Sequence, residues 1–117
     1  MFIALIIVTV VLAALAAGSA AKKLQRDQQV IDVIVGTVGV PDRYIPALAA
    51  LELAGAAGIV IGLWYTPIGI AAATGLVAYF AGAIIGHLRV GDTKGLAMPI
   101  VPLLLSIAVL VLRIITA

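Results

Sequence analysis

Four apolar stretches, each about twenty residues long, constrain this chain more than any other feature of its sequence. Their expected bounds are residues 2–21, 44–63, 67–86 and 96–115. A helix needs about 20 apolar residues to cross the hydrocarbon core of a bilayer, so each stretch has the length of one membrane span. Four spans leave too few of the 117 residues for a second domain. The sequence therefore predicts one all-α domain, an antiparallel bundle of four transmembrane helices surrounded by lipid.

The composition excludes several classes of protein. Charged residues make up 10% of the chain, whereas a soluble domain carries about a quarter. The chain has no cysteine, which excludes a disulfide, a thiolate metal site and thiol redox chemistry. It has one histidine, so a haem held by two histidines of the same chain is excluded as well. We expect neither a metal site nor a set of cofactor ligands.

The basic residues predict how the bundle is oriented. Six of the seven lie in two connections, 22–43 and 87–95, and the seventh is Arg113. Connections rich in Lys and Arg stay in the cytoplasm. The prediction therefore places both longer connections inside, and both termini and the Trp64 turn outside. The net charge of +2 is assigned to this bias and not to a nucleic-acid partner.

The connection 22–43 is expected to contain a short helix. Apolar residues recur at helical spacing from Val30 to Val38, and Gly39-Val40-Pro41-Asp42 reads as a helix stop. Two placements are open: the helix lies in the membrane interface, or it packs against the bundle. The end of the first stretch also resembles a signal-peptidase site, but a retained span is favoured because no basic residue precedes the apolar run.

Small residues form a stripe on each of the two middle spans, and each stripe ends in a GxxxG pattern. In lipid, small residues let helices approach closely. The stripes therefore mark packing between helices of the same chain or between copies in a homo-oligomer. On either interpretation, leucine at Gly58 or Gly82 is expected to disturb packing more than leucine at Gly69. The stripe residues are Ala50, Ala54, Gly58 and Gly62, followed by Ala78, Gly82 and Gly86.

Glu52 is the least expected residue of the chain. It follows Arg43 by nine residues, or about 13 Å of helix rise, which places its carboxylate near the bilayer midplane. Acids at this depth are costly and mark functional or assembly sites. A turn centred between Tyr65 and Thr66 brings position 52 opposite Tyr79, so we expect the phenol and the carboxyl to meet.

The same register gathers five polar side chains where the second and third spans meet the predicted cytoplasmic side. Two interpretations are open: ordinary ion pairing with lipid headgroups and loops, or a ligand site. The five residues are Asp42, Arg43, His87, Arg89 and Asp92.

The motifs Gly39-Val40-Pro41, Leu51-Glu52-Leu53-Ala54-Gly55 and Gly86-His87-Leu88-Arg89-Val90-Gly91-Asp92 resemble those of the DoxX-like family of small four-helix membrane proteins. The resemblance covers nearly the whole chain. It implies a multi-pass protein of the bacterial plasma membrane, with Glu52 and His87 as its characteristic polar residues and Arg89 and Asp92 behind them. It also implies a role beside membrane redox complexes or in the assembly of other membrane proteins.

Three functional hypotheses follow. The first is a non-enzymatic accessory or assembly subunit that docks a membrane-protein partner or a second copy. It is favoured because few residues carry chemistry and no loop is large enough to build an active site. The alternatives are a small proton-coupled transporter that uses Glu52, and a redox subunit whose Glu52, Tyr79 or His87 binds a quinone.

Overall fold

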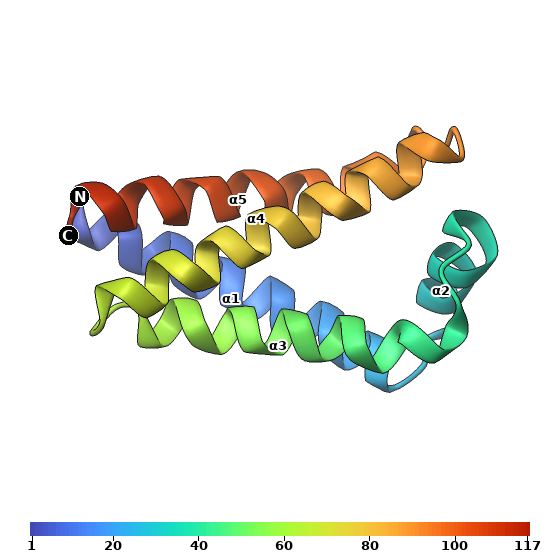
Figure 1. Ribbon diagram of the computed structural model, residues 1–117, viewed down its shortest axis with the longest axis horizontal. Helices are drawn as coiled ribbons and strands as arrows, with labels where there is room; N and C mark the ends of the chain where they lie inside the picture. Colours follow the sequence, from blue (N-terminus) through green and yellow to red (C-terminus); the bar gives the residue numbers. More distant parts are fainter.

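The computed structural model describes all residues from 1 to 117 and is a bundle of four long helices. These are α1 (Phe2–Leu24), α3 (Ile45–Ile61), α4 (Thr66–Arg89) and α5 (Ala97–Ile115). Each packs against the next, and α5 returns to α1, so the helices form a closed ring. Both termini lie at the same end of the bundle (Figure 1). Short 3₁₀ turns, η2 (Asp42–Tyr44) and η3 (Lys94–Leu96), precede α3 and α5 and lengthen them. With these turns included, each of the four helices is long and apolar enough to span a membrane. The predicted fold class is confirmed.

The two ends of the bundle differ in charge. We call the end with the connections α1–α3 and α4–α5 the basic end, and the end with both termini and the Trp64 turn the terminal end. Two helices extend further toward the basic end than expected. Helix α1 reaches Leu24 and not residue 21, and α4 reaches Arg89 and not residue 86. Helix α4 continues because no helix breaker occurs before Gly91, whose φ of +70° suits glycine. Which end faces the cytoplasm stays a prediction.

The connection between α1 and α3 contains the expected short helix, α2 (Gln28–Ile31), which continues as the π-helix η1 (Asp32–Val38). The Asp27 side chain caps its start by accepting from the Val30 amide at 3.3 Å. Gly39, in the left-handed region with φ of +87°, ends it. Val38 packs on Gly86 of α4, where an added Cβ would lie 3.1 Å from it. The helix thus contacts the bundle through Val38, and its placement in the membrane interface stays a prediction.

Helices α3 and α4 meet in the register that the sequence predicted. Near the terminal end Gly62 faces the backbone of Gly69 so closely that a Cβ on residue 62 would overlap it. Gly58 faces Ala72 in the same way one turn further along. These pairs are symmetric about the turn at Tyr65, so Gly58 and Gly62 of the α3 stripe lie against α4 of the same chain.

The rest of the small-residue prediction needs correction. Leucine at Gly69 was expected to disturb packing least. Gly69 lies, however, at the closest approach of α3 and α4, and a Cβ added to it would lie 3.2 Å from a side-chain carbon of Arg113. Gly82 has no atom within 4 Å of an added Cβ. Internal packing therefore does not account for Gly82. Helical periodicity identified the stripes but not which part of each stripe the partner helix covers.

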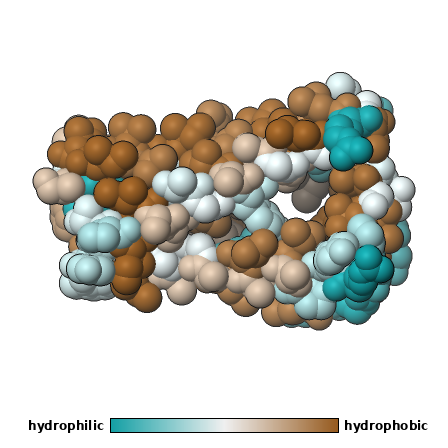
Figure 2. Space-filling model, in the orientation of Figure 1, coloured by the Kyte–Doolittle hydropathy of each residue, from teal (hydrophilic) through white to brown (hydrophobic).

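Helices α3 and α4 leave a groove between them beyond their glycine contact. The groove has a volume of about 670 Å³, and Figure 2 shows the molecule hollowed between these two helices toward the basic end. Tyr79 is its one polar side chain, and small residues of both helices form most of its wall. Among the lining residues are Ala54, Gly55, Gly58, Ala72, Gly75 and Ala78. The exposed Ala50 and Gly82 continue the two stripes beyond this lining.

Candidate functional site: a buried ion pair beside an open groove

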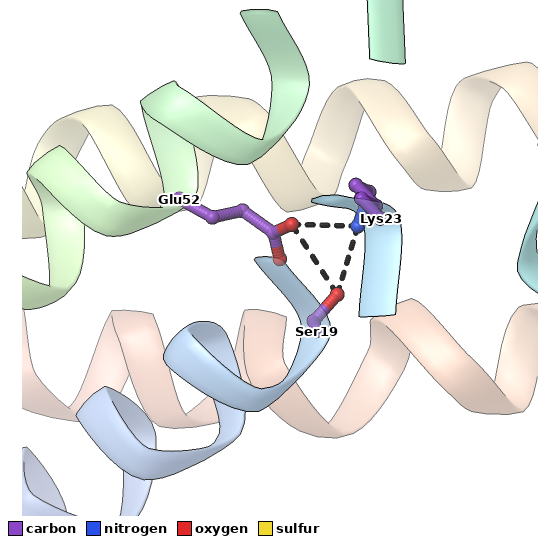
Figure 3. A network of polar contacts seen from close by, with 3 residues as sticks. All are labelled: Ser19, Lys23 and Glu52. Atoms are coloured by element: carbon purple, nitrogen blue, oxygen red, sulfur yellow. Dashed lines mark hydrogen bonds and ion pairs between the residues drawn. The ribbon is translucent and has the colours of Figure 1, made fainter. Parts of the chain in front are cut away.

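Glu52 forms a buried ion pair with Lys23 of α1. The Lys23 Nζ lies 2.6 Å from the Glu52 Oε1. The Ser19 hydroxyl accepts from Lys23 at 2.8 Å and donates to Glu52 at 3.3 Å. Figure 3 shows the three side chains converging from α1 and α3, and we call them the polar cluster. Because 8% of the Lys23 side chain and none of Glu52 is exposed, the pair satisfies the requirement that an acid inside a membrane be partnered.

The directions of the helices explain how these side chains meet. Side chains of an α-helix lean toward its N-terminus. Lys23 lies in the last turn of α1, so it leans from the basic end into the bundle. Glu52 lies on the antiparallel α3, which begins at the basic end, so it leans back toward Lys23. Ser19 precedes Lys23 by four residues and therefore lies on the same face of α1.

Glu52 has more partners than the sequence predicted. Tyr79 of α4 lies close enough to interact with the Glu52 carboxylate both electrostatically and by hydrogen bonding. The hydrogen bonds to Oε1 come from Ser19 and Lys23. The register of one turn located Tyr79 but gave no information about α1, which packs along the other side of α3.

A second polar contact closes the connection between α4 and α5. The His87 Nδ1 lies 2.8 Å from the Asp92 Oδ2, and the Gly95 amide donates to Asp92 Oδ1 at 3.1 Å. A Cβ on residue 95 would overlap both side chains, so the position requires glycine. The hydrogen bond with His87, and then that from the Gly95 amide, hold the pKa of Asp92 below its usual value.

The five polar residues expected in one layer do not form one cluster. His87 and Asp92 bind each other, as described. Asp42 pairs instead with Arg26, and the Arg43 guanidinium lies over the ring of Tyr44, 4.9 Å from its centroid. Arg89 is exposed and pairs with no carboxylate. The residues share the basic end but do not meet in one cluster, because sequence register gives depth and not the direction around each helix.

Arg113 is a buried residue that the sequence reasoning used only for orientation. It is 5% exposed and donates from Nη1 to the Gly62 carbonyl at 2.9 Å, which caps the end of α3. Its Nη2 donates to the Thr116 hydroxyl at 3.2 Å. The signal that could have found it is a lone cation in the last turn of an otherwise apolar helix.

These contacts give the buried charges a common role. Lys23 and Glu52 join α1 to α3, His87 and Asp92 join α4 to the next connection, and Arg113 joins α5 to α3. Each ionisable side chain inside the bundle is thus used to hold segments together. The feature left open by the fold is the groove between α3 and α4, which reaches the polar cluster only through Tyr79.

Comparison with protein families finds a match to the model described as the DoxX-like family, over residues 7–109 of the chain. Comparisons with curated proteins and with solved structures find no match.

Proposed function

We propose that this chain, which belongs to the DoxX-like family, is a non-enzymatic accessory or assembly subunit that binds one transmembrane helix of a larger membrane complex. The groove between α3 and α4 is the observation that carries this proposal. Membrane redox complexes are among the candidate partners that the family resemblance suggests.

The α4 side of the groove has the character of an unused packing surface. Gly75, Ala78 and Gly82 follow one another at helical spacing, and all three are exposed. A Cβ on either glycine would meet no atom within 4 Å. Small residues in a bilayer act by allowing another helix backbone to come close. The chain uses Gly62 and Gly69 in this way internally, and it leaves the stripe from Gly75 to Gly82 free for a helix from outside.

A helix fits the groove better than a lipid chain does. An acyl chain packs on any apolar surface, so it gains nothing specific from consecutive small residues. An entering helix gains van der Waals contact at each of them, and its polar groups can bond the Tyr79 hydroxyl on the groove wall. The volume of about 670 Å³ accommodates the side chains of such a helix.

The polar cluster gives less support to the two alternatives. A proton-coupled transporter needs its acid to exchange protons with a wet cavity, whereas Glu52 is fully buried and bound to Lys23. A quinone site needs hydrogen-bonding groups at both carbonyls, whereas Tyr79 is the one polar side chain that reaches the groove. The ion pair instead fixes α1 against α3, and so holds one wall of the groove in place.

The experiment compares leucine at two open glycines. Gly75 on the groove wall and Gly18 on α1 both have no atom within 4 Å of an added Cβ, so neither substitution should lower thermal stability. Tagged chains are purified from gently solubilised membranes, and the stoichiometry of any membrane partner is measured. We expect Gly75→Leu to reduce the bound partner at least tenfold and Gly18→Leu to leave it bound.

Several outcomes would contradict the proposal. A partner kept by Gly75→Leu, or lost equally with Gly18→Leu, does not use this groove. A species of twice the 11.9 kDa mass of the chain that Gly75→Leu abolishes would make a second copy the occupant. A quinone recovered in stoichiometric amount and lost with Gly75→Leu would make the groove a redox site.

A further inference from the structure

A second cleft lies at the basic end and shares no lining residue with the α3–α4 groove. Its volume is about 380 Å³. One side is the loop from Val38 to Pro41 that leaves η1, and the other is the last turn of α4, with Gly86, Arg89 and Val90. The cleft therefore opens where the spanning helix α4 ends, at the depth where lipid headgroups begin.

Arg89 gives this cleft an unneutralised positive charge. The guanidinium is exposed, and no carboxylate of the chain pairs with it. The aspartates of the basic end have other partners within the fold. These aspartates are Asp27 on the Val30 amide, Asp32 on Gln28, Asp42 on Arg26, and Asp92 on His87 and Gly95. An anion from outside is therefore the complementary partner of Arg89.

The other residues that line the cleft indicate which chemical class of anion it can bind. Val38, Val40 and Val90 give it an apolar lining beside the guanidinium. A planar guanidinium binds phosphate oxygens in pairs, whereas valine side chains favour hydrocarbon. A molecule with a phosphate joined to an apolar body matches both parts, and the bilayer supplies such molecules at this depth.

We propose that the cleft between the 38–41 loop and the end of α4 binds the headgroup of an anionic phospholipid, with Arg89 on its phosphate and the three valines against its glycerol and upper acyl carbons. The site is separate from the partner helix proposed above, and it stands whether or not that helix binds. The lipid would hold η1 and its loop against α4 at the membrane surface.

The test measures lipid retention by the purified full-length chain. The chain in detergent is titrated with phosphatidylglycerol or with phosphatidylcholine, and native mass spectrometry counts the bound lipids. We expect one phosphatidylglycerol to be retained in preference to phosphatidylcholine. Arg89→Gln should weaken that binding about fivefold, the factor expected for one basic residue near a membrane surface.

Lys94→Gln is the matched control, because Lys94 is an exposed cation of the same end that does not line the cleft. It should keep the preference for phosphatidylglycerol. Equal losses for both variants would show diffuse attraction to the basic end and overturn the site, as would equal retention of the two lipids by the wild type. Displacement of the lipid by excess inorganic phosphate would make the ligand a soluble anion and overturn the lipid assignment.

Two controls distinguish a loss of lipid binding from a failure of the variant to fold. Circular dichroism verifies the helical content of each variant, and Arg89→Lys keeps the charge but not the paired hydrogen bonds. We expect Arg89→Lys to retain phosphatidylglycerol more tightly than Arg89→Gln and less tightly than the wild type. If Arg89→Gln does not fold, an Arg89→Lys variant that folds and binds both lipids as the wild type does would contradict the role of the guanidinium.

Discussion

Removing Lys23 alone should destabilise the bundle more than removing Lys23 and Glu52 together. Lys23→Met removes the one cation beside the fully buried Glu52 carboxylate, which keeps the Ser19 hydroxyl at 3.3 Å and the nearby Tyr79 phenol. Breaking a buried ion pair from one side costs about 3–5 kcal/mol, whereas hydrogen bonds between membrane helices contribute on average about 0.6 and at most about 1.7 kcal/mol. Because the pair is charged, 2.6 Å long and shielded from solvent, we expect the free energy of unfolding to fall by at least about 2 kcal/mol.

The double variant Lys23→Met/Glu52→Met removes both charges and keeps similar volumes, so it should lie within about 1 kcal/mol of the wild type. Reversible unfolding in mixed micelles, followed by helical circular dichroism, measures all variants. Lys22→Met is the control, because Lys22 is exposed and should change stability by no more than about 0.5 kcal/mol. Equal losses for the single and double variants, or a Lys23→Met loss as small as that of Lys22→Met, would refute the reasoning.

Leucine at Gly69 should lower the melting temperature sharply, because even a Cβ there lies 2.9 Å from the α3 backbone, while Gly82→Leu should leave it nearly unchanged. The reverse order would refute the helix contact seen in the structure. Arg113→Met should cost about 1.5–3 kcal/mol in the same unfolding assay, because the Gly62 carbonyl loses a charged donor; wild-type stability would show that this bond contributes nothing. The pKa of Asp92 is lowered in the folded protein, so its carboxylate stabilises the fold. This contribution is complete above the usual aspartate pKa of about 3.9 and is lost as the pH falls through the lowered pKa. The difference in melting temperature between wild type and Asp92→Asn should therefore be present at neutral pH and shrink in acid, and a difference that stays constant would contradict this.

The fold could be predicted from sequence because bilayer thickness sets the length of each helix and one tight turn sets the register of α3 and α4. The same turn explains why Gly62 and Gly69 oppose each other, and why Tyr79 lies at the level of Glu52. Local signals also predicted the short helix after α1. The apolar spacing from Val30 to Val38 indicates the helix, and Gly39 ends it independently of which segments pack around it.

The site could be predicted only in part, because its contacts depend on which helices are neighbours and how each is rotated. Lys23 reads in the sequence as an ordinary cation at the end of a span, and nothing local reveals that α1 turns it toward Glu52. The glycine stripes show the same limit: spacing is identical at Gly58 and Gly82, yet only the first faces another helix of the chain. Arg113 illustrates a third case, since its partner is a backbone carbonyl that sequence patterns do not mark.

The most direct test of the central proposal uses the absence of cysteine from the chain. A single cysteine introduced as Gly75→Cys, on the groove wall and labelled with a short photoreactive crosslinker in native membranes, reports what lies in the groove. We expect an adduct in which the linked peptide is a transmembrane helix of another protein, and no such adduct from Gly18→Cys on α1. Adducts with lipid alone, with a second copy of the chain, or with the same peptides at both positions would contradict it.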